Sequence, residues 1–293
     1  MKTPRAITSL TVLVALALGG LALAQRNRDR DRDRDRDRDR NDPFGQMGFG
    51  RKGVPDWEAK SHMPDDVFTF VRIKYESNGG GWGRRGGKWR TDYPDSDLNF
   101  SYRLQELTSM EVDPDGKILE LTDPELFDYP FVYMIEPGDI WLSEEEIVAL
   151  RKYLRNCGFM MVDDFWGTWE WENFYRVIKQ VFPDREPEEI PLEHNIFHCV
   201  FDLQEKPQVP ALQDAIRGRD SGVTWEWRKP GSKTVEYKQL KDDDGRMMCI
   251  ICFNTDLGDG WEREGEDRWY FKEFSEKKAY PMGVNIVFYA LTH

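Results

Sequence analysis

The sequence predicts an α/β fold in which a mostly parallel sheet lies between two layers of helices. Residues 159–162 form a short apolar run without alternation, as expected of a strand covered on both faces. Similar runs alternate along the chain with amphipathic helical patterns, which is the arrangement of α/β domains. No internal repeat or boundary divides residues 64–293. We therefore expect one three-layer α/β/α domain.

Each element has its own signal. Residues 67–75 are rich in β-branched and aromatic side chains and predict the first strand. Ser143 and Glu146 form a capping box that begins a helix. Residues 224–228 and 234–240 alternate in polarity and predict two exposed strands, which form a small β-hairpin insertion or an edge of the sheet. Further strands are expected at residues 118–121, 131–135, 159–162 and 247–253, and helices at 95–108, 144–154, 168–182 and 281–292. For residues 281–292 a strand is the alternative.

The first 63 residues do not fit this pattern. Residues 1–24 combine early positive charges, an apolar stretch and a small-residue cleavage site, which predicts a secretory signal peptide. An uncleaved anchor helix is the alternative, and no later segment predicts a membrane span. Residues 25–63 contain a near-perfect Arg-Asp alternation and then a Gly- and Pro-rich linker, which predicts disorder. We expect an exported protein of a bacterial envelope, periplasmic or secreted.

Net charge limits the possible binding partners, and the cysteine spacing limits the possible disulfides and metal sites. The chain carries −13, and leaving out Lys2, Arg5 and the eight Arg and seven Asp of residues 25–42 gives −16. An acidic domain argues against nucleic-acid binding. Cys249 and Cys252 are three residues apart on a predicted strand and so face opposite sides of the sheet. A disulfide such as Cys157–Cys199 stays open, as does the oligomeric state.

A Gly-rich loop follows the first strand. Residues 81–86 spell a formal G-x-G-x-x-G, but Pro94 interrupts the helix that a dinucleotide site would require. A mobile loop over a site is the preferred interpretation.

Polar residues follow several predicted strands and should converge at one edge of the sheet. They suggest two chemistries: a divalent cation held by carboxylate oxygens, or a carboxylate pair that hydrolyses a glycan. The catalytic candidates are Asp163, Asp164 and His194; the ligand-binding candidates are Tyr75, Glu136, Trp166, Asn254, Trp261 and Glu262; and the metal-binding candidates are Asp164, Asp256 and Asp259.

Each candidate also has a structural interpretation. Asp163 and Asp164 are neighbours, so one of them should face away from the cleft, and carboxylates near a helix start are favoured without a ligand. His194 fits a hydrogen-bonded structural role as well as catalysis. The chain has 11 Trp, which suit saccharide stacking if they are exposed and the core if they are not.

The pattern of a covalent hydrolase is absent from the sequence. There is no Gly-x-Cys-x-Gly or Gly-x-Ser-x-Gly, and Cys157 precedes its strand instead of following it. Whether the protein is an enzyme stays uncertain, with the balance against it. The expected function is a non-catalytic envelope binding or scaffold protein with an acidic, aromatic-lined cleft for a saccharide or a divalent cation, or for an envelope protein as partner. The alternative is a glycan hydrolase that uses carboxylates.

From about residue 64 to residue 292 the sequence resembles the domain-of-unknown-function 4159 family. The segments that carry the resemblance are FVRIKY at 70–75, TDYP at 91–94, YPFVYM at 129–134, LRKYL at 150–154, GFMMVDDF at 158–165, VFPD at 181–184, HNIF at 194–197, NTDLGD at 254–259 and GVNIVFY at 283–289. The resemblance implies a class I glutamine amidotransferase-like (flavodoxin-like) fold, distantly similar to trehalose-utilisation-type proteins. It implies no function. Cys157 departs from the family pattern, where a second Gly is expected.

Overall fold

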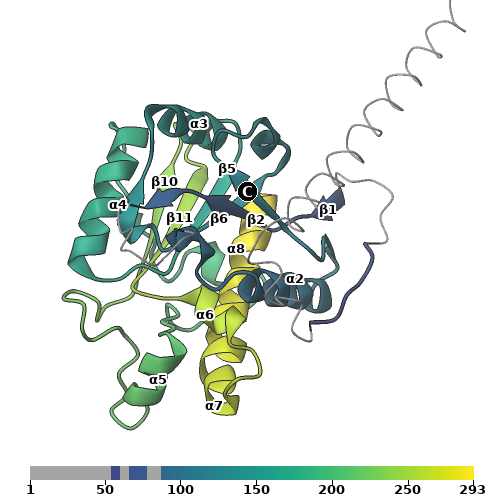
Figure 1. Cartoon of the computed structure of the whole chain (residues 1–293), viewed down its shortest axis with the longest axis vertical. Coiled ribbons are helices and arrows are strands. Elements are labelled where there is room, and N and C mark those ends of the chain that lie inside the picture. The colour runs from purple at the N-terminus through teal and green to yellow at the C-terminus, as the bar shows by residue number, and fades with distance from the viewer. Residues whose placement is uncertain (1–53, 60–65, 78–86) are drawn as a thin grey trace, which may run out of the picture. The chain divides into compact units, whose positions relative to one another are not determined.

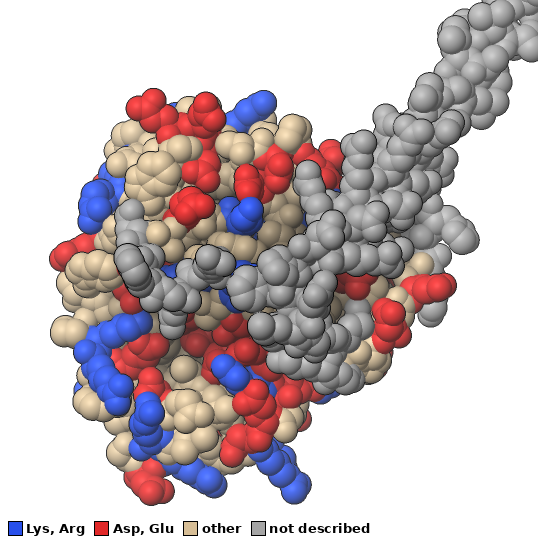
Figure 2. All heavy atoms as spheres, in the orientation of Figure 1, with Lys and Arg blue, Asp and Glu red and all other residues tan. Residues whose placement is uncertain are grey.

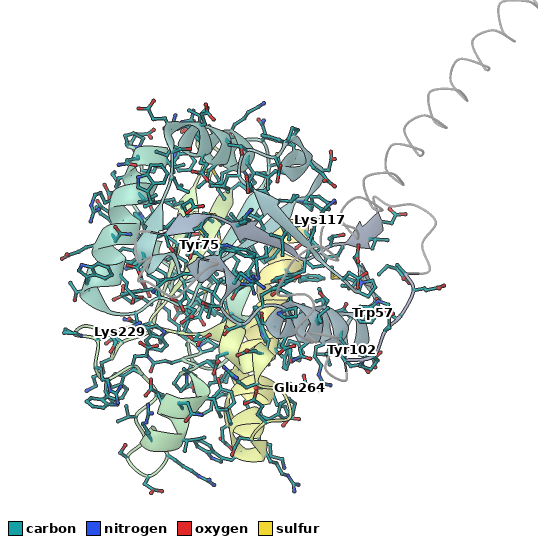
Figure 3. All side chains as sticks on the ribbon, viewed as in Figure 1. Trp57, Tyr75, Tyr102, Lys117, Lys229 and Glu264 are labelled. Atoms are coloured by element: carbon teal, nitrogen blue, oxygen red, sulfur yellow. The ribbon has the colours of Figure 1, made fainter. Side chains whose placement is uncertain are left out.

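The computed structural model describes residues 54–59, 66–77 and 87–293. The predicted signal peptide, the Arg-Asp segment and residues 78–86 of the Gly-rich loop lie outside these ranges. Of the predicted linker, residues 54–59 are described. There Trp57 packs against Tyr102, with ring centroids 5.8 Å apart, and donates a hydrogen bond to the Val112 carbonyl over 2.9 Å (Figure 3). This part of the linker is therefore packed against the domain.

The centre of the domain is a seven-stranded sheet in the order β5-β2-β6-β8-β11-β10-β9 (Figure 1). Five neighbours are parallel: β5 (Lys117–Glu120), β2 (Val71–Lys74), β6 (Phe131–Ile135), β8 (Phe159–Asp163) and β11 (Met247–Phe253). Then β10 (Glu236–Lys241) and β9 (Glu188–Glu189) pair antiparallel at one side. The α/β prediction with a mostly parallel sheet is confirmed.

Helices pack against both faces of the sheet. On one face Tyr133, Met161 and Ile250 join a buried cluster with α2 (Asp95–Leu107) and α8 (Tyr280–Thr292). On the other face Val132, Met160 and Ile251 join a second cluster with α3 (Glu144–Arg155) and α4 (Gly167–Val181). Successive residues of one strand thus alternate between two apolar layers, which is why the strands read as continuous apolar runs.

The remaining elements are short. They are β1 (Val67–Phe68), β3 (Glu76–Ser77), β4 (Glu111–Val112), β7 (Ile140–Trp141), α5 (Leu212–Gly218), α6 (Leu257–Glu262), α7 (Arg268–Tyr270), the 3-10 turns η3 (Lys88–Arg90), η4 (Pro124–Asp128), η5 (Pro137–Asp139) and η6 (Asn195–Phe197), and the π-helical turn η7 (Phe271–Ala279). Among the described residues, no helix has the length and apolar character needed to cross a bilayer.

Two of the predicted elements differ in the structure. The stretch expected as one strand at 67–75 is divided between β1 and β2, with β3 following it, and only β2 joins the main sheet. No strand covers residues 224–228, so the separate hairpin is wrong: β10 pairs with β11 and extends the main sheet. Turns at Gly222 and Gly231, both with positive φ, bound the stretch between them.

The capping box at Ser143 is confirmed. Its hydroxyl accepts from the Glu146 amide, and the Glu146 carboxylate accepts from the Ser143 amide. All four cysteines are free, so Cys157–Cys199 is not a disulfide. Cys249 and Cys252 are buried in different apolar clusters, as their spacing predicts. Cys157 has a φ of 66°, the left-handed conformation that glycine adopts most readily.

Candidate functional site

The carboxyl ends of the parallel strands carry an unusual backbone. Glu136 follows β6, Asp164 follows β8 and Asn254 follows β11, and their φ angles are 47°, 55° and 60°. Asp92, between η3 and α2, has a φ of 62°. These are four of the five described non-glycine residues with positive φ. Such conformations cost energy and persist only where the surrounding structure holds them, often at functional sites.

Three carboxylates meet at this edge. Asp92, Asp164 and Asp256 each offer an oxygen, and these atoms all lie within 4.8 Å of one another. Asp164 is 7% exposed and Asp256 4%. Asp92 Oδ2 is buried and has no hydrogen-bond partner. We call these three residues the aspartate triad.

Few groups balance the charge of the triad. The Trp166 indole donates to Asp164 Oδ1 over 3.1 Å, and the Asp259 amide donates to Asp256 Oδ1 over 2.7 Å. Within the described ranges, no ion pair involves a triad carboxylate. Figure 2 shows acidic side chains gathered near the centre of one face of the molecule.

Burial and mutual repulsion act on the triad in the same direction. Burial raises the pKa of Asp92 well above its ordinary value, and the charges of Asp259 and Glu262 raise it further. The pKa of Asp164 is raised by burial and then by Glu136 and Asp92. Burial followed by Asp164 and Asp259 raises that of Asp256. The triad therefore resists full ionisation unless a positive charge joins it.

Asp92 also belongs to a second group of acids. Its oxygen lies within 4.8 Å of oxygens of Asp259 and Glu262. Here Arg263 supplies positive charge, with its Nε 3.1 Å from Asp259 Oδ1 and 2.8 Å from Glu262 Oε2. Burial raises the pKa of Glu262 to about 7, although Arg263 acts to lower it. The two acidic groups share one carboxylate but differ in their counter-charge.

Asp163 lies apart from the triad. Its Oδ2 accepts from the Tyr133 hydroxyl at 3.1 Å and from the Gly258 amide at 3.0 Å. Burial raises its pKa to about 7, against the lowering effect of these hydrogen bonds. Of the two neighbouring aspartates, Asp164 is therefore the one in the triad, and Asp163 holds the start of α6 against β6.

Asn254 has a positioning role. Its side chain accepts from the Gly167 amide and donates to the carbonyls of Gly231 and Thr234, over 2.7 to 3.0 Å. These bonds fix the start of α4 and the loop beside it. Because all its donors are used in this way, Asn254 is a poor match for the expected ligand role.

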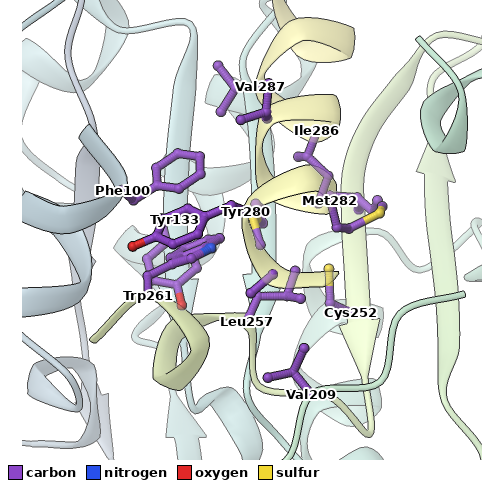
Figure 4. Close-up of a cluster of buried hydrophobic side chains, with 14 of the residues drawn as sticks. Phe100, Tyr133, Val209, Cys252, Leu257, Trp261, Tyr280, Met282, Ile286 and Val287 are labelled. Carbon is purple, nitrogen blue, oxygen red and sulfur yellow. The ribbon is translucent and has the colours of Figure 1, made fainter. Parts of the chain in front are cut away.

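The aromatic candidates lie in the interior. Trp166 is 1% exposed and Trp261 is fully buried beside Phe100 and Tyr133 (Figure 4). Neither offers a face on which a saccharide could stack, so both are corrected to core residues. Tyr75 is also buried, and its hydroxyl donates to the Ile135 and Glu136 carbonyls. The exposed indoles of the described domain are others: Trp141, Trp169 and Trp227.

The two remaining candidates, Glu136 and His194, also lie outside the triad. The Glu136 carboxylate accepts from the Thr91 hydroxyl and pairs with Lys88 at 2.7 Å. His194 accepts from the Ile196 amide and packs against Tyr289. Burial and the charges of Lys241 and His293 lower its pKa. Lys241 lies opposite Met247 in the strand register, at the amino end of β11. Because His194 feels the charge of Lys241, it lies toward the amino end of β11, away from the carboxyl ends of the strands where the triad is. The expectation that it assists Asp163 or Asp164 is wrong.

Asp92 was missed by the sequence reasoning. It lies between the Gly-rich loop and the helix predicted at 95–108, and it follows no predicted strand. The segment TDYP at 91–94 carried part of the family resemblance, and that was its one signal. The structure brings it to the triad because Arg72 holds the preceding turn, donating to the Trp89 and Thr91 carbonyls over 2.9 and 3.0 Å.

The comparisons with known proteins add a family and no activity. No curated protein matches the chain. The model of the family described as "Domain of unknown function (DUF4159)" matches residues 69–291. That range contains β2 and the strands that follow it, the aspartate triad and Arg263. The chain therefore belongs to the DUF4159 family.

Proposed function

We propose that the protein binds one divalent cation through Asp92, Asp164 and Asp256. The observation that supports this most directly is the convergence of three carboxylate oxygens within 4.8 Å, from the buried Asp164 and Asp256 and the partly buried Asp92, with no ion pair to any of them among the described residues. A cation bound at about 2.0–2.6 Å from each oxygen requires ligand separations of this size. Carboxylate oxygens are the ligands that Mg²⁺, Mn²⁺ and Ca²⁺ prefer.

The cost of burying the triad carboxylates favours the binding of a positive ion from solution. Burying ionised carboxylates without a partner is costly, so a triad that binds no cation takes up protons or holds strain. The unpartnered Oδ2 of Asp92 shows this most clearly, because a buried acceptor normally has a donor. A bound cation removes the repulsion and supplies the missing partner.

The cation fits a binding or scaffold role better than the hydrolase alternative. That alternative depended on His194, which lies away from the triad, and on Asp163, whose Oδ2 accepts from Tyr133 and Gly258. A saccharide partner would depend on the exposed Trp141, Trp169 and Trp227. Export to the envelope and a class I glutamine amidotransferase-like arrangement of the sheet remain part of this proposal.

A thermal-shift titration of the full chain tests the cation. The protein is first treated with EDTA, then titrated with Mg²⁺, Mn²⁺ or Ca²⁺. At 100 times Kd a single site stabilises by about 2.7 kcal/mol, which raises Tm by roughly 5–10 °C for a domain of this size. Asp164→Asn and Asp256→Asn should abolish the shift and raise the Tm of the metal-free protein, because each removes a repelling charge.

Asp184→Asn is the matched control. Asp184 is exposed and lies after α4, so its substitution should leave the cation-dependent shift intact. If none of the three cations changes Tm at millimolar concentration, the proposal is wrong. It is equally wrong if the Asp164→Asn and Asp184→Asn proteins respond alike.

A further inference from the structure

The acidic cluster has two halves that share Asp92. The first half is the aspartate triad. The second half consists of Asp92, Asp259 and Glu262, whose oxygens also lie within 4.8 Å of one another. Two cation positions joined by one carboxylate are the usual layout of a two-metal centre. The two halves differ in one respect: in the second, the guanidinium of Arg263 pairs with Asp259 and Glu262.

We propose that Arg263 occupies the second cation position, so that the cluster binds one exchangeable cation and gains a second when Arg263 is removed. The inference rests on the proposed function, since it assumes that the triad holds the first cation. It assigns a latent second site to Asp92, Asp259 and Glu262, and it identifies Arg263 as the residue that keeps the centre mononuclear.

The contacts of Arg263 support this position. Its Nε lies between Asp259 Oδ1 and Glu262 Oε2, at 3.1 and 2.8 Å, and its Nη1 reaches Glu266 at 3.1 Å. The side chain is 34% exposed. A guanidinium at this place neutralises the acids as a metal ion would, but it cannot be exchanged.

The second half would survive the loss of Arg263. Asp259 Oδ2 accepts from the Leu212 amide at 2.5 Å and from the Tyr270 hydroxyl at 3.4 Å, so its position does not depend on Arg263. A cavity of about 100 Å³ borders Asp259 and Arg263. That space gives water and an entering cation access to the Asp259 side of the second half.

An unpartnered oxygen points to the shared position. Asp92 Oδ2 is buried without a hydrogen-bond partner, and it belongs to the one side chain common to both halves. Arg263 makes no ion pair with Asp92 among the described contacts. The guanidinium thus donates to Asp259 and lies near the charge of Glu262, whose Oε2 has no hydrogen-bond partner, and it leaves the shared carboxylate for the cation in the first half.

Counting bound Mn²⁺ in the full chain tests the inference. After EDTA treatment, titration followed by electron paramagnetic resonance reports free Mn²⁺, and therefore the number bound. The unmodified protein should bind one. Arg263→Met should bind two, and its spectrum should broaden because the two ions lie close together. Arg263→Met combined with Glu262→Gln should return to one.

The controls separate charge from folding. Arg263→Lys keeps a positive charge and should still bind one Mn²⁺. Arg103→Met removes an arginine that pairs with Glu264, outside both acidic groups, and should also bind one. If Arg263→Met does not fold, Arg263→Gln keeps hydrogen-bond donors without the charge and should bind two.

The outcomes distinguish the two proposals. If the unmodified protein binds no Mn²⁺, Mg²⁺ or Ca²⁺, the proposed function fails. If the unmodified protein binds two Mn²⁺, or if both Arg263→Met and Arg263→Gln bind fewer than two while the unmodified protein binds one, the function stands and the role of Arg263 is wrong.

Discussion

Asp97 and the aspartate triad both lie near the start of α2, and they differ in how their negative charge is balanced. Asp97, on α2, is paired with Arg72 of β2, which has no exposed surface. The Arg72 guanidinium donates to Asp97, to the Ser96 hydroxyl and to two backbone carbonyls. Asp164 and Asp256 of the aspartate triad are also buried, but the triad has no such partner. The first group fastens β2 to η3 and α2.

The difference teaches which carboxylates are structural. A buried charge that the fold itself neutralises has its hydrogen bonds satisfied and needs nothing from outside. A buried set of like charges without a counter-ion is the one that calls for a ligand. Asp163 is an intermediate case, since a hydroxyl and an amide donate to its Oδ2 while its buried Oδ1 has no hydrogen-bond partner.

Breaking the ion pair between Arg72 and Asp97 should have the largest effect on stability. Arg72→Met leaves Asp97 buried without its partner and frees the turn that carries Asp92. We expect the free energy of unfolding to fall by about 3–5 kcal/mol, measured by urea denaturation. The double variant Arg72→Met with Asp97→Leu should regain part of this loss, because no unpaired charge remains. A loss below 1 kcal/mol in the single variant would mean that the pair contributes little to the fold.

The pH dependence of stability sharpens the comparison. The folded protein holds the pKa of Asp163 and Glu262 at about 7, above the ordinary values of 3.8 and 4.5. Between these limits the folded state binds more protons than the unfolded state, so stability decreases as pH rises. Each such group contributes up to about 1.4 kcal/mol per pH unit in that window.

Metal-free protein should therefore have a higher free energy of unfolding at pH 5 than at pH 7.5, as measured by urea denaturation at each pH. The triad acids, with their raised pKa values, act in the same direction. Saturating Mn²⁺ should weaken or reverse the slope, since a cation favours the ionised triad. Metal-free stability that rises steadily from pH 5 to pH 7.5 would contradict the raised pKa values.

Some of this site was predictable from the sequence. Strand ends identify the edge where side chains converge, so Asp164 and Asp256 were found from the apolar runs that precede them. The capping box and the parallel strands followed from local patterns in the same way. These predictions succeed because they depend on neighbours in the chain.

The rest depends on contacts between distant segments. Asp92 reaches the triad through Arg72, and no local pattern relates those two residues. Trp166 and Trp261 lie in loop-like stretches but are buried, because the segments that cover them come from elsewhere in the chain. His194 follows no predicted strand end, so only the fold could place it. Apolar periodicity predicts which strand residues face each side of the sheet, but it does not predict where side chains outside the strands lie.

A partly exposed ion-pair group at the same edge should give the smallest effect on stability. Lys88 pairs with Glu136 at 2.7 Å and with Asp139 at 2.8 Å, and the three side chains are 14% to 22% exposed. Lys88→Met should lower the free energy of unfolding by no more than about 1 kcal/mol, because solvent stabilises the released charges. Because the Glu136 charge acts on Asp164, losing Lys88 should also tighten Mn²⁺ binding slightly, measured by calorimetry. If Lys88→Met lowered the free energy of unfolding as much as Arg72→Met, solvent exposure would not explain the difference between the Lys88 ion pairs and the Arg72–Asp97 pair.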